Sequence, residues 1–204
     1  LRTSRGLGDV YKRQLMDRTK SRPIPAGIIA SQTALYFGLS LSILGLIILF
    51  IFVNSLTAVL GLITVLLYIF VYTPLKKITW LNTTIGAIPG AMPTLGGWAA
   101  AANELDPNSW ILFAILFLWQ HPHFYAIALM CKKDYEKAGF KMLPVIEEEN
   151  FRTNRQILWH AFLLIPVSLF FVVTGILGEV YFWGALVLGI GYLVSGIPLL
   201  RNTT

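Results

Sequence analysis

Six long apolar stretches divide the chain, and short polar segments separate them. The stretches run over residues 29–53, 56–74, 84–102, 109–131, 157–177 and 180–200. Each is close to the roughly 17–25 residues that an α-helix needs to cross a bilayer. The pattern predicts an all-α, polytopic membrane bundle of about six transmembrane helices, forming one membrane domain over residues 15–204.

The basic residues alternate with these stretches. All 16 Lys and Arg residues fall before the first stretch or after the second, fourth and sixth. The other connections carry acidic residues instead, namely Glu104, Asp106 and Glu179. Because Lys and Arg are retained on the cytoplasmic side of a membrane, we expect every basic loop there. The net charge of +6 therefore reflects orientation and does not indicate nucleic-acid binding.

Composition agrees with a membrane protein and excludes an ordinary soluble domain. Hydrophobic residues make up 56% of the chain and charged residues 13%, and the mean hydropathy is +0.68. A single cysteine, Cys131, excludes an intrachain disulfide. Residues 1–14 are polar and aperiodic, and we expect them to be non-native or disordered. The chain also stops directly after its last apolar stretch, so we expect it to be a truncated piece of a longer protein.

The third stretch contains four glycines and two prolines between residues 86 and 98. Pro89 and Pro93 each remove a backbone donor and favour a bend. Gly86 and Gly90 would let a neighbouring helix approach closely. Two interpretations stay open, tight helix packing alone or a bent helix that lines a pocket.

Histidines near the end of the fourth stretch are candidates for chemistry. Ionisable groups within a membrane helix are rare and indicate function by default. Helical spacing places Trp119, His123 and Asp134 on one face, and directs His121 elsewhere. The alternatives are a structural hydrogen bond and contact with haem, whose iron imidazole can ligate. No cysteine or carboxylate lies at zinc-ligand spacing beside these histidines.

A second candidate cluster is cationic and lies in the basic loops. Arg18, Lys20, Arg22 and Lys76 should lie at the same membrane level as Asp134. Arg and Lys bind phosphate groups well, and Mg²⁺ is held by carboxylates together with phosphate oxygens. The cluster suits a diphosphate, although the charges could also serve only to orient the protein.

Five sequence strings resemble the UbiA-type membrane prenyltransferases. They begin at Arg18 (RTKSRP), Tyr72 (YTPLK), Gly86 (GAIPGAMP), Trp119 (WQHPHF) and Asp134 (DYEKAGFKMLP). The last two are similar to the members of that family that act on haem. The resemblance runs from about Leu15 to Arg201. It implies a nine-helix fold, of which this chain would hold the third to the eighth helix.

The resemblance implies a transferase that moves a farnesyl group from farnesyl diphosphate to a vinyl group of protohaem IX (haem b). The product would be haem O, for haem-copper oxidase biogenesis in a bacterial cytoplasmic (inner) membrane. The implied partners are farnesyl diphosphate, haem b, the lipid bilayer, and haem A synthase or oxidase assembly factors. The implied cofactor is Mg²⁺. The implied site residues are Asp134 as the catalytic, Mg²⁺-approaching carboxylate; Arg18, Lys20, Arg22 and Lys76 for the diphosphate; and His121, His123, Trp119 and Trp98 for the haem and prenyl pocket.

Two departures from the family pattern bear on activity. The first acidic motif should place aspartates at positions 9 and 13, but only Asp9 is in register and position 13 is Arg. Lys133 also stands where many members have another acid. We therefore expect this fragment to be inactive by itself. Two alternatives remain: a haem-binding or haem-transporting protein using His121, His123 and His160, and a UbiA-type transferase with an aromatic acceptor.

Overall fold

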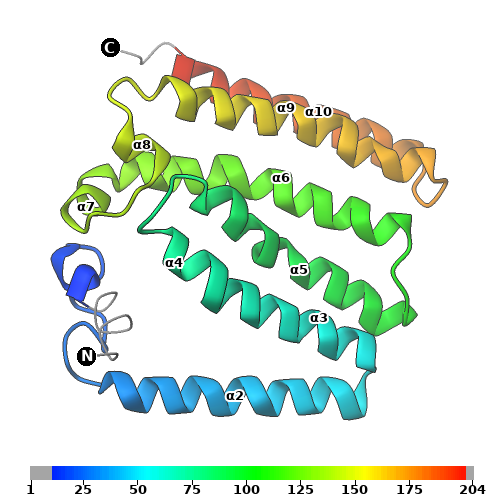
Figure 1. The fold of residues 1–204 in the computed structure, drawn as a ribbon. Helices are drawn as coiled ribbons and strands as arrows, with labels where there is room; N and C mark the ends of the chain where they lie inside the picture. Colours follow the sequence, from blue (N-terminus) through cyan, green and yellow to red (C-terminus); the bar gives the residue numbers. More distant parts are fainter. Residues whose placement is uncertain (1–10, 201–204) are drawn as a thin grey trace.

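The computed structural model describes residues 11–200, which form a bundle of helices without any strand in that range (Figure 1). The long helices are α2 (Ser31–Phe52), α3 (Ser55–Leu66), α5 (Asn82–Ala102), α6 (Pro107–Met130), α9 (Phe151–Val173) and α10 (Glu179–Gly196). The short elements are η1 (Leu67–Tyr72), α4 (Thr73–Leu75), α7 (Lys132–Lys137), α8 (Leu143–Ile146) and η2 (Ile197–Leu200). The segment predicted to be non-native or disordered, residues 1–14, lies mostly outside the described range. Its last part is helical over residues 11–14, and its origin stays a prediction.

Helices that follow one another in the sequence pack side by side. The contacts run α2 to α3, α3 to α5, α5 to α6, α6 to α9 and α9 to α10. In Figure 1 these helices form a row in which the chain reverses direction at each step. The short helices α7 and α8 and the segment before α2 therefore lie together at one end of the bundle. This is the end to which the sequence assigned the basic loops.

The predicted all-α membrane bundle is confirmed. Within residues 11–200, five helices are long and apolar enough to span a bilayer, namely Ser31–Phe52, Ser55–Leu75, Pro107–Met130, Phe151–Val173 and Glu179–Leu199. The remaining predicted span is α5, a helix of 21 residues that is not apolar enough to be one of these five. It packs against both α3 and α6, and nine of its residues are buried. A helix covered by protein needs fewer apolar side chains that face lipid. Helix α2, in contrast, buries none of its residues.

Helix α5 contains Pro89 and Pro93 in its interior and still continues to Ala102. Its glycines allow close packing on both sides. A Cβ atom on Gly90 would lie well inside van der Waals contact with Oε1 of Gln120 on α6. The Gln120 amide in turn donates to the carbonyl oxygens of Leu116 and Ala87, at 3.0 and 3.4 Å. The tight-packing interpretation of this segment is therefore correct for Gly90.

Helix α3 widens into the π-helical turn η1 before it reaches Pro74. Proline lacks an N–H and its ring crowds the preceding turn, so the regular α-helical ladder cannot continue unchanged through Pro74. The Thr73 hydroxyl donates to the carbonyl oxygen of Tyr68 at 2.8 Å and satisfies one backbone acceptor in this turn. The helix thus continues without a break to Lys76, at the basic end of the bundle.

Candidate functional site

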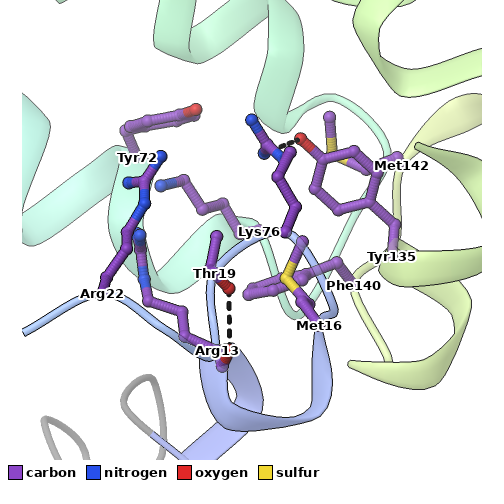
Figure 2. A pocket seen from close by; sticks show the side chains of 10 residues that line it. Arg13, Met16, Thr19, Arg22, Tyr72, Lys76, Tyr135, Phe140 and Met142 are labelled. Carbon is purple, nitrogen blue, oxygen red and sulfur yellow. Dashed lines mark hydrogen bonds between the residues drawn. The ribbon is translucent and has the colours of Figure 1, made fainter. Parts of the chain in front are cut away.

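A cavity of about 180 Å³ opens at the basic end of the bundle (Figure 2). Its lining comes from the segment before α2, from the end of η1 and α4, from α7 and from the loop after α7. The lining residues are Arg13, Met16, Arg18, Thr19, Arg22, Tyr72, Lys76, Tyr135, Phe140 and Met142. Every charged residue in this set is a cation. The cavity is smaller than the roughly 300–1,000 Å³ of typical small-molecule sites, so it suits a compact anion.

One wall of the cavity is apolar. Met16, Ala138 and Phe140 are buried and pack together, with Tyr135 and Met142 against them. The Arg18 guanidinium donates to the Tyr135 hydroxyl at 3.4 Å. Burial raises the pKa of Tyr135 above its usual value, although nearby Arg18 acts in the opposite direction. The phenol therefore stays neutral at physiological pH and can act as a hydrogen-bond donor.

The opposite side of the cavity presents Lys76 from the end of α4. Its ammonium lies 4.2 Å from the ring centre of Tyr72 and 5.8 Å from that of Tyr68, which are cation–π distances. The backbone N–H of Lys141 donates to the Lys76 carbonyl oxygen at 3.0 Å. The Asn82 amide donates to the Lys141 carbonyl oxygen at 2.9 Å and holds that loop on α5.

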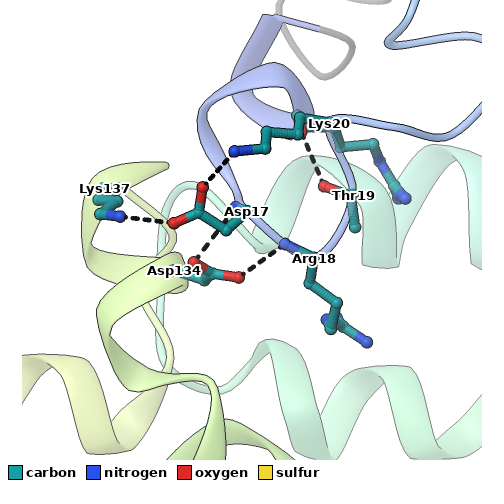
Figure 3. A network of polar contacts seen from close by, with 7 residues as sticks. Asp17, Arg18, Thr19, Lys20, Asp134 and Lys137 are labelled. Atoms are coloured by element: carbon teal, nitrogen blue, oxygen red, sulfur yellow. Dashed lines mark hydrogen bonds and ion pairs between the residues drawn. The ribbon is translucent and has the colours of Figure 1, made fainter.

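Two carboxylates fasten the segment that carries Arg18 to α7 (Figure 3). The oxygens of Asp134 accept the backbone N–H groups of Asp17 and Arg18, at 3.3 and 3.2 Å. Asp17 forms ion pairs with Lys137 at 2.8 Å and with Lys20 at 2.7 Å. The hydrogen bond from Lys137, followed by that from Lys20, lowers the pKa of Asp17 to about 2.

The structure brings three of the four predicted diphosphate residues together. Arg18, Arg22 and Lys76 all line the cavity. Lys20 is exposed and turned onto Asp17, so it does not line the cavity. No sequence pattern assigned a role to Tyr72, Tyr135 or Thr19. The spacing of Tyr68, Tyr72 and Lys76 by four residues was a signal that these side chains share one helix face.

The described residues do not fit the magnesium ion that the family resemblance implies. The charged groups that line the cavity are cationic, and Asp134 is directed to backbone amides outside it. Asp17 is neutralised by Lys137 and Lys20. Within residues 11–200, no group of three or more His, Cys, Asp or Glu side chains could hold a metal ion.

The two histidines of α6 face different surroundings, as their spacing predicted. His121 is 0% exposed, and its ring stacks on that of His160 from α9, with centroids 3.9 Å apart. Nδ1 of His121 lies 2.7 Å from the Phe117 carbonyl oxygen. Because a carbonyl oxygen only accepts hydrogen bonds, Nδ1 carries the ring proton and Nε2 carries the lone pair. Nε2 lies 3.4 Å from the Thr84 hydroxyl, which can donate to it.

The four residues predicted to line a haem and prenyl pocket do not converge on one cavity. His123 is exposed and stacks on Trp119 at 5.1 Å. Trp119 borders an open, apolar groove of about 510 Å³ between α6, α9 and α10. Trp98 and Thr84 are fourteen residues apart on α5, or roughly 21 Å along a helix, so Trp98 lies far from His121.

The fold and the cavity define a polytopic membrane protein with a cationic site at one end of its bundle. The chain belongs to the UbiA prenyltransferase family, which matches residues 8–204. It is 52% identical over 189 residues to the protoheme IX farnesyltransferase of Solibacter usitatus. It is 43% identical over 190 residues to that of Sorangium cellulosum and 42% identical over 183 residues to that of Myxococcus xanthus.

These alignments cover 93%, 93% and 90% of the chain and 65%, 68% and 62% of the three relatives. The chain therefore spans about two thirds of the length of the curated relatives it matches. No solved structure matches the chain. The family resemblance inferred from the five sequence strings is confirmed.

Proposed function

We propose that the protein of which this chain is part transfers a farnesyl group from farnesyl diphosphate to a vinyl group of protohaem IX and thereby makes haem O. The relatives named protoheme IX farnesyltransferase support the reaction. The observation that carries the proposal is the convergence of Arg18, Arg22 and Lys76 on one small cavity. With Arg13, which also lines the cavity, four cations lie beside an apolar wall, and this arrangement suits the charged end of an apolar substrate.

The cations act on the bond that breaks. The carbon–oxygen bond of farnesyl diphosphate cleaves, and its electron pair leaves with the diphosphate. Preorganised positive charge stabilises this developing anion most strongly where water is excluded. Arg18 and Arg22 each offer a planar fork to phosphate oxygens, and Lys76 offers a point charge.

The allylic carbon that remains bonds to the terminal vinyl carbon of haem. The resulting cation next to the porphyrin takes up water and releases a proton to solvent, which leaves a hydroxyethylfarnesyl group. The allylic cation must not meet water first. Met16, Phe140 and Met142 form the apolar wall that would exclude water from the diphosphate end.

Several attributes of the whole protein belong to the same proposal. The basic end faces the cytoplasm of a bacterium, since Lys and Arg stay on that side of its inner membrane. Haem A synthase or other oxidase assembly factors receive the product. Magnesium assistance stays a prediction.

The geometry of His121 and His160 supports the haem-carrier alternative less well than the cationic cavity supports the transferase. Their rings are nearly parallel, at 9°, and in van der Waals contact. His121 and His160 therefore leave no space between them for a porphyrin held from both faces. No observation favours an aromatic acceptor over haem.

A chimera provides the test of the proposed reaction. Residues 15–200 replace the matching segment of the Solibacter usitatus relative, which supplies the flanking segments. Membranes containing the chimera receive haem b, farnesyl diphosphate and Mg²⁺, and haem mass is followed by liquid chromatography. We expect a gain of one farnesyl group plus water, which is lost in the double variant Arg22→Ala/Lys76→Ala.

Replacing Lys133 by Ala is the matched control, because Lys133 is an exposed cation on α7 that does not line the cavity. The control should retain turnover. Haem that co-purifies unmodified with the chimera, while the parent relative converts it, contradicts the proposal and supports the carrier.

A further inference from the structure

The ring of Tyr72 lies directly against the backbone of Gly86 on α5. A Cβ atom added to Gly86 would lie well inside van der Waals contact with Cε2 and Cδ2 of that ring. Real Cβ contacts are not this short, so any larger residue at position 86 must displace something. Because Gly86 is buried within α5, the freer partner is the Tyr72 side chain. The Tyr72 ring can therefore occupy its position only because Gly86 of α5 has no side chain.

The same ring is the closest aromatic contact of Lys76. Tyr68, Tyr72 and Lys76 follow one another at four-residue spacing through η1 and α4, and the two rings lie 5.2 Å apart. The Lys76 ammonium is nearer to Tyr72 than to Tyr68, at 4.2 against 5.8 Å. Cation–π attraction is strongest with the cation over the ring face and decreases with distance. A shift of the Tyr72 ring therefore moves the favoured position of the ammonium.

We propose that Gly86 is a positioning residue that seats the Tyr72 ring so that Tyr72 directs Lys76 into the cationic cavity. This inference rests on the proposed function, because the cavity is taken to hold the diphosphate of the prenyl substrate. Gly86 itself does not line the cavity, whereas Tyr72 and Lys76 do. Gly86 thus acts through the side chains of Tyr72 and Lys76 and does not contact the ligand.

Helix α5 offers a matched control for the substitution. Gly96 and Gly97 lie on the same helix, and a Cβ atom on either would meet nothing within 4 Å. Gly96→Ala changes helix propensity as Gly86→Ala does, but displaces no side chain. A difference between the two variants therefore reports the contact with Tyr72 and not the general effect of replacing glycine.

The first measurement reports the Lys76 position without any ligand. The chain carries lysine labelled with ¹³C at Cε, and Lys76→Arg identifies the Lys76 signal. We expect the Lys76 protons to lie upfield of those of exposed Lys133, because the Tyr72 ring shields them. Gly86→Ala should abolish most of that shift, and Gly96→Ala should keep it. A Lys76 signal that does not move in Gly86→Ala overturns the inference.

The second measurement reports binding, by calorimetric titration of the purified chain with farnesyl diphosphate and with inorganic diphosphate in the presence of EDTA. Gly86→Ala should weaken both affinities by roughly tenfold, which is the order of one cation–π contact. In a Lys76→Met background, Gly86→Ala should cause no further loss, since its effect passes through Lys76. Equal losses in both backgrounds mean that the substitution only destabilises the fold, and they overturn the inference.

The two proposals fail in different ways. If the wild-type chain and Gly96→Ala bind neither diphosphate, the proposed function loses its site, and the inference falls with it. If both bind and Gly86→Ala binds equally well, only the inference is overturned. Tyr72→Phe keeps the ring, and should preserve both the Lys76 shift and most of the affinity. Tyr72→Leu should lose both, even where Gly86→Ala does not fold.

Discussion

The carboxylate of Asp134 accepts the backbone N–H of Arg18 at 3.2 Å, although 116 positions separate the two residues in the sequence. Its other oxygen accepts the N–H of Asp17 at 3.3 Å. The segment that supplies Arg18 and Arg22 to the cavity is thereby fixed to α7 before any ligand binds. Fixing cations in advance reduces the entropy that a ligand must otherwise offset when it orders them.

Loss of the Asp134 carboxylate should therefore release this segment. We expect Asp134→Ala to increase the rate of tryptic cleavage after Arg18 and Lys20 by about tenfold, because hydrogen bonds to a charged group contribute about 1.5–3 kcal/mol and this site is partly exposed. Cleavage is followed by mass spectrometry of the chain in detergent. Glu136→Ala is the control, since Glu136 is exposed on the same helix. Equal cleavage rates in both variants would show that Asp134 does not hold the segment.

The ion pairs of Asp17 predict a particular response to pH. The folded pKa of this carboxyl is about 2, against an ordinary value of 3.8. Because the folded pKa is lowered, the ion pairs make their full contribution to the free energy of unfolding above pH 3.8, and this contribution is lost as the pH falls through about 2. A ¹³C-carboxyl titration of Asp17 by NMR should show this midpoint. Lys137→Ala should raise the midpoint more than Lys20→Ala, because the hydrogen bond from Lys137 lowers the pKa of Asp17 most; the reverse order would contradict this prediction.

Replacement of the two α6 histidines should have unequal effects on stability. His121 is fully buried against His160, and His121→Ala should cost about 2–3 kcal/mol through the cavity it leaves. His123 is exposed beside Trp119, so His123→Ala should cost less than about 1 kcal/mol. Unfolding of the chain in mixed detergent micelles, followed by circular dichroism, measures both. Equal losses would mean that the faces of α6 are assigned incorrectly.

Apolar stretch length and charge alternation were enough to predict the long helices and the end at which the basic segments gather. The helical period also placed His121 and His123 on different faces. Neither signal could show that Lys20 turns away from the cavity. Lys20 turns onto Asp17, three positions away, and the place of Asp17 in the fold depends in turn on its pairing with Lys137, 120 positions away. Single-sequence patterns carry no information on such distant pairs.

The role of Asp134 illustrates the same limit. The sequence strings assigned it to a metal site by resemblance, whereas the described structure directs its oxygens to the amides of Asp17 and Arg18. A carboxylate in a motif can bind a cation or cap a turn, and the choice depends on which donors the fold brings near. The stacking of His121 on His160 was likewise invisible, because it depends on the rotation of α9 against α6.

The contact between Gly90 and Gln120 gives a test of how α5 is held in the bundle. Gly90→Ala would place a methyl group well inside van der Waals contact with Oε1 of Gln120, whose amide donates to the Leu116 carbonyl oxygen. We expect the variant to lose about 1–3 kcal/mol of stability, which is typical of overpacking at a tight interface. Gly97→Ala should be nearly neutral, because its Cβ meets nothing within 4 Å. In a Gln120→Ala background, where the obstructing amide is absent, Gly90→Ala should cost much less. A cost that is the same in both backgrounds would mean that the penalty arises within α5 itself and not at its contact with α6.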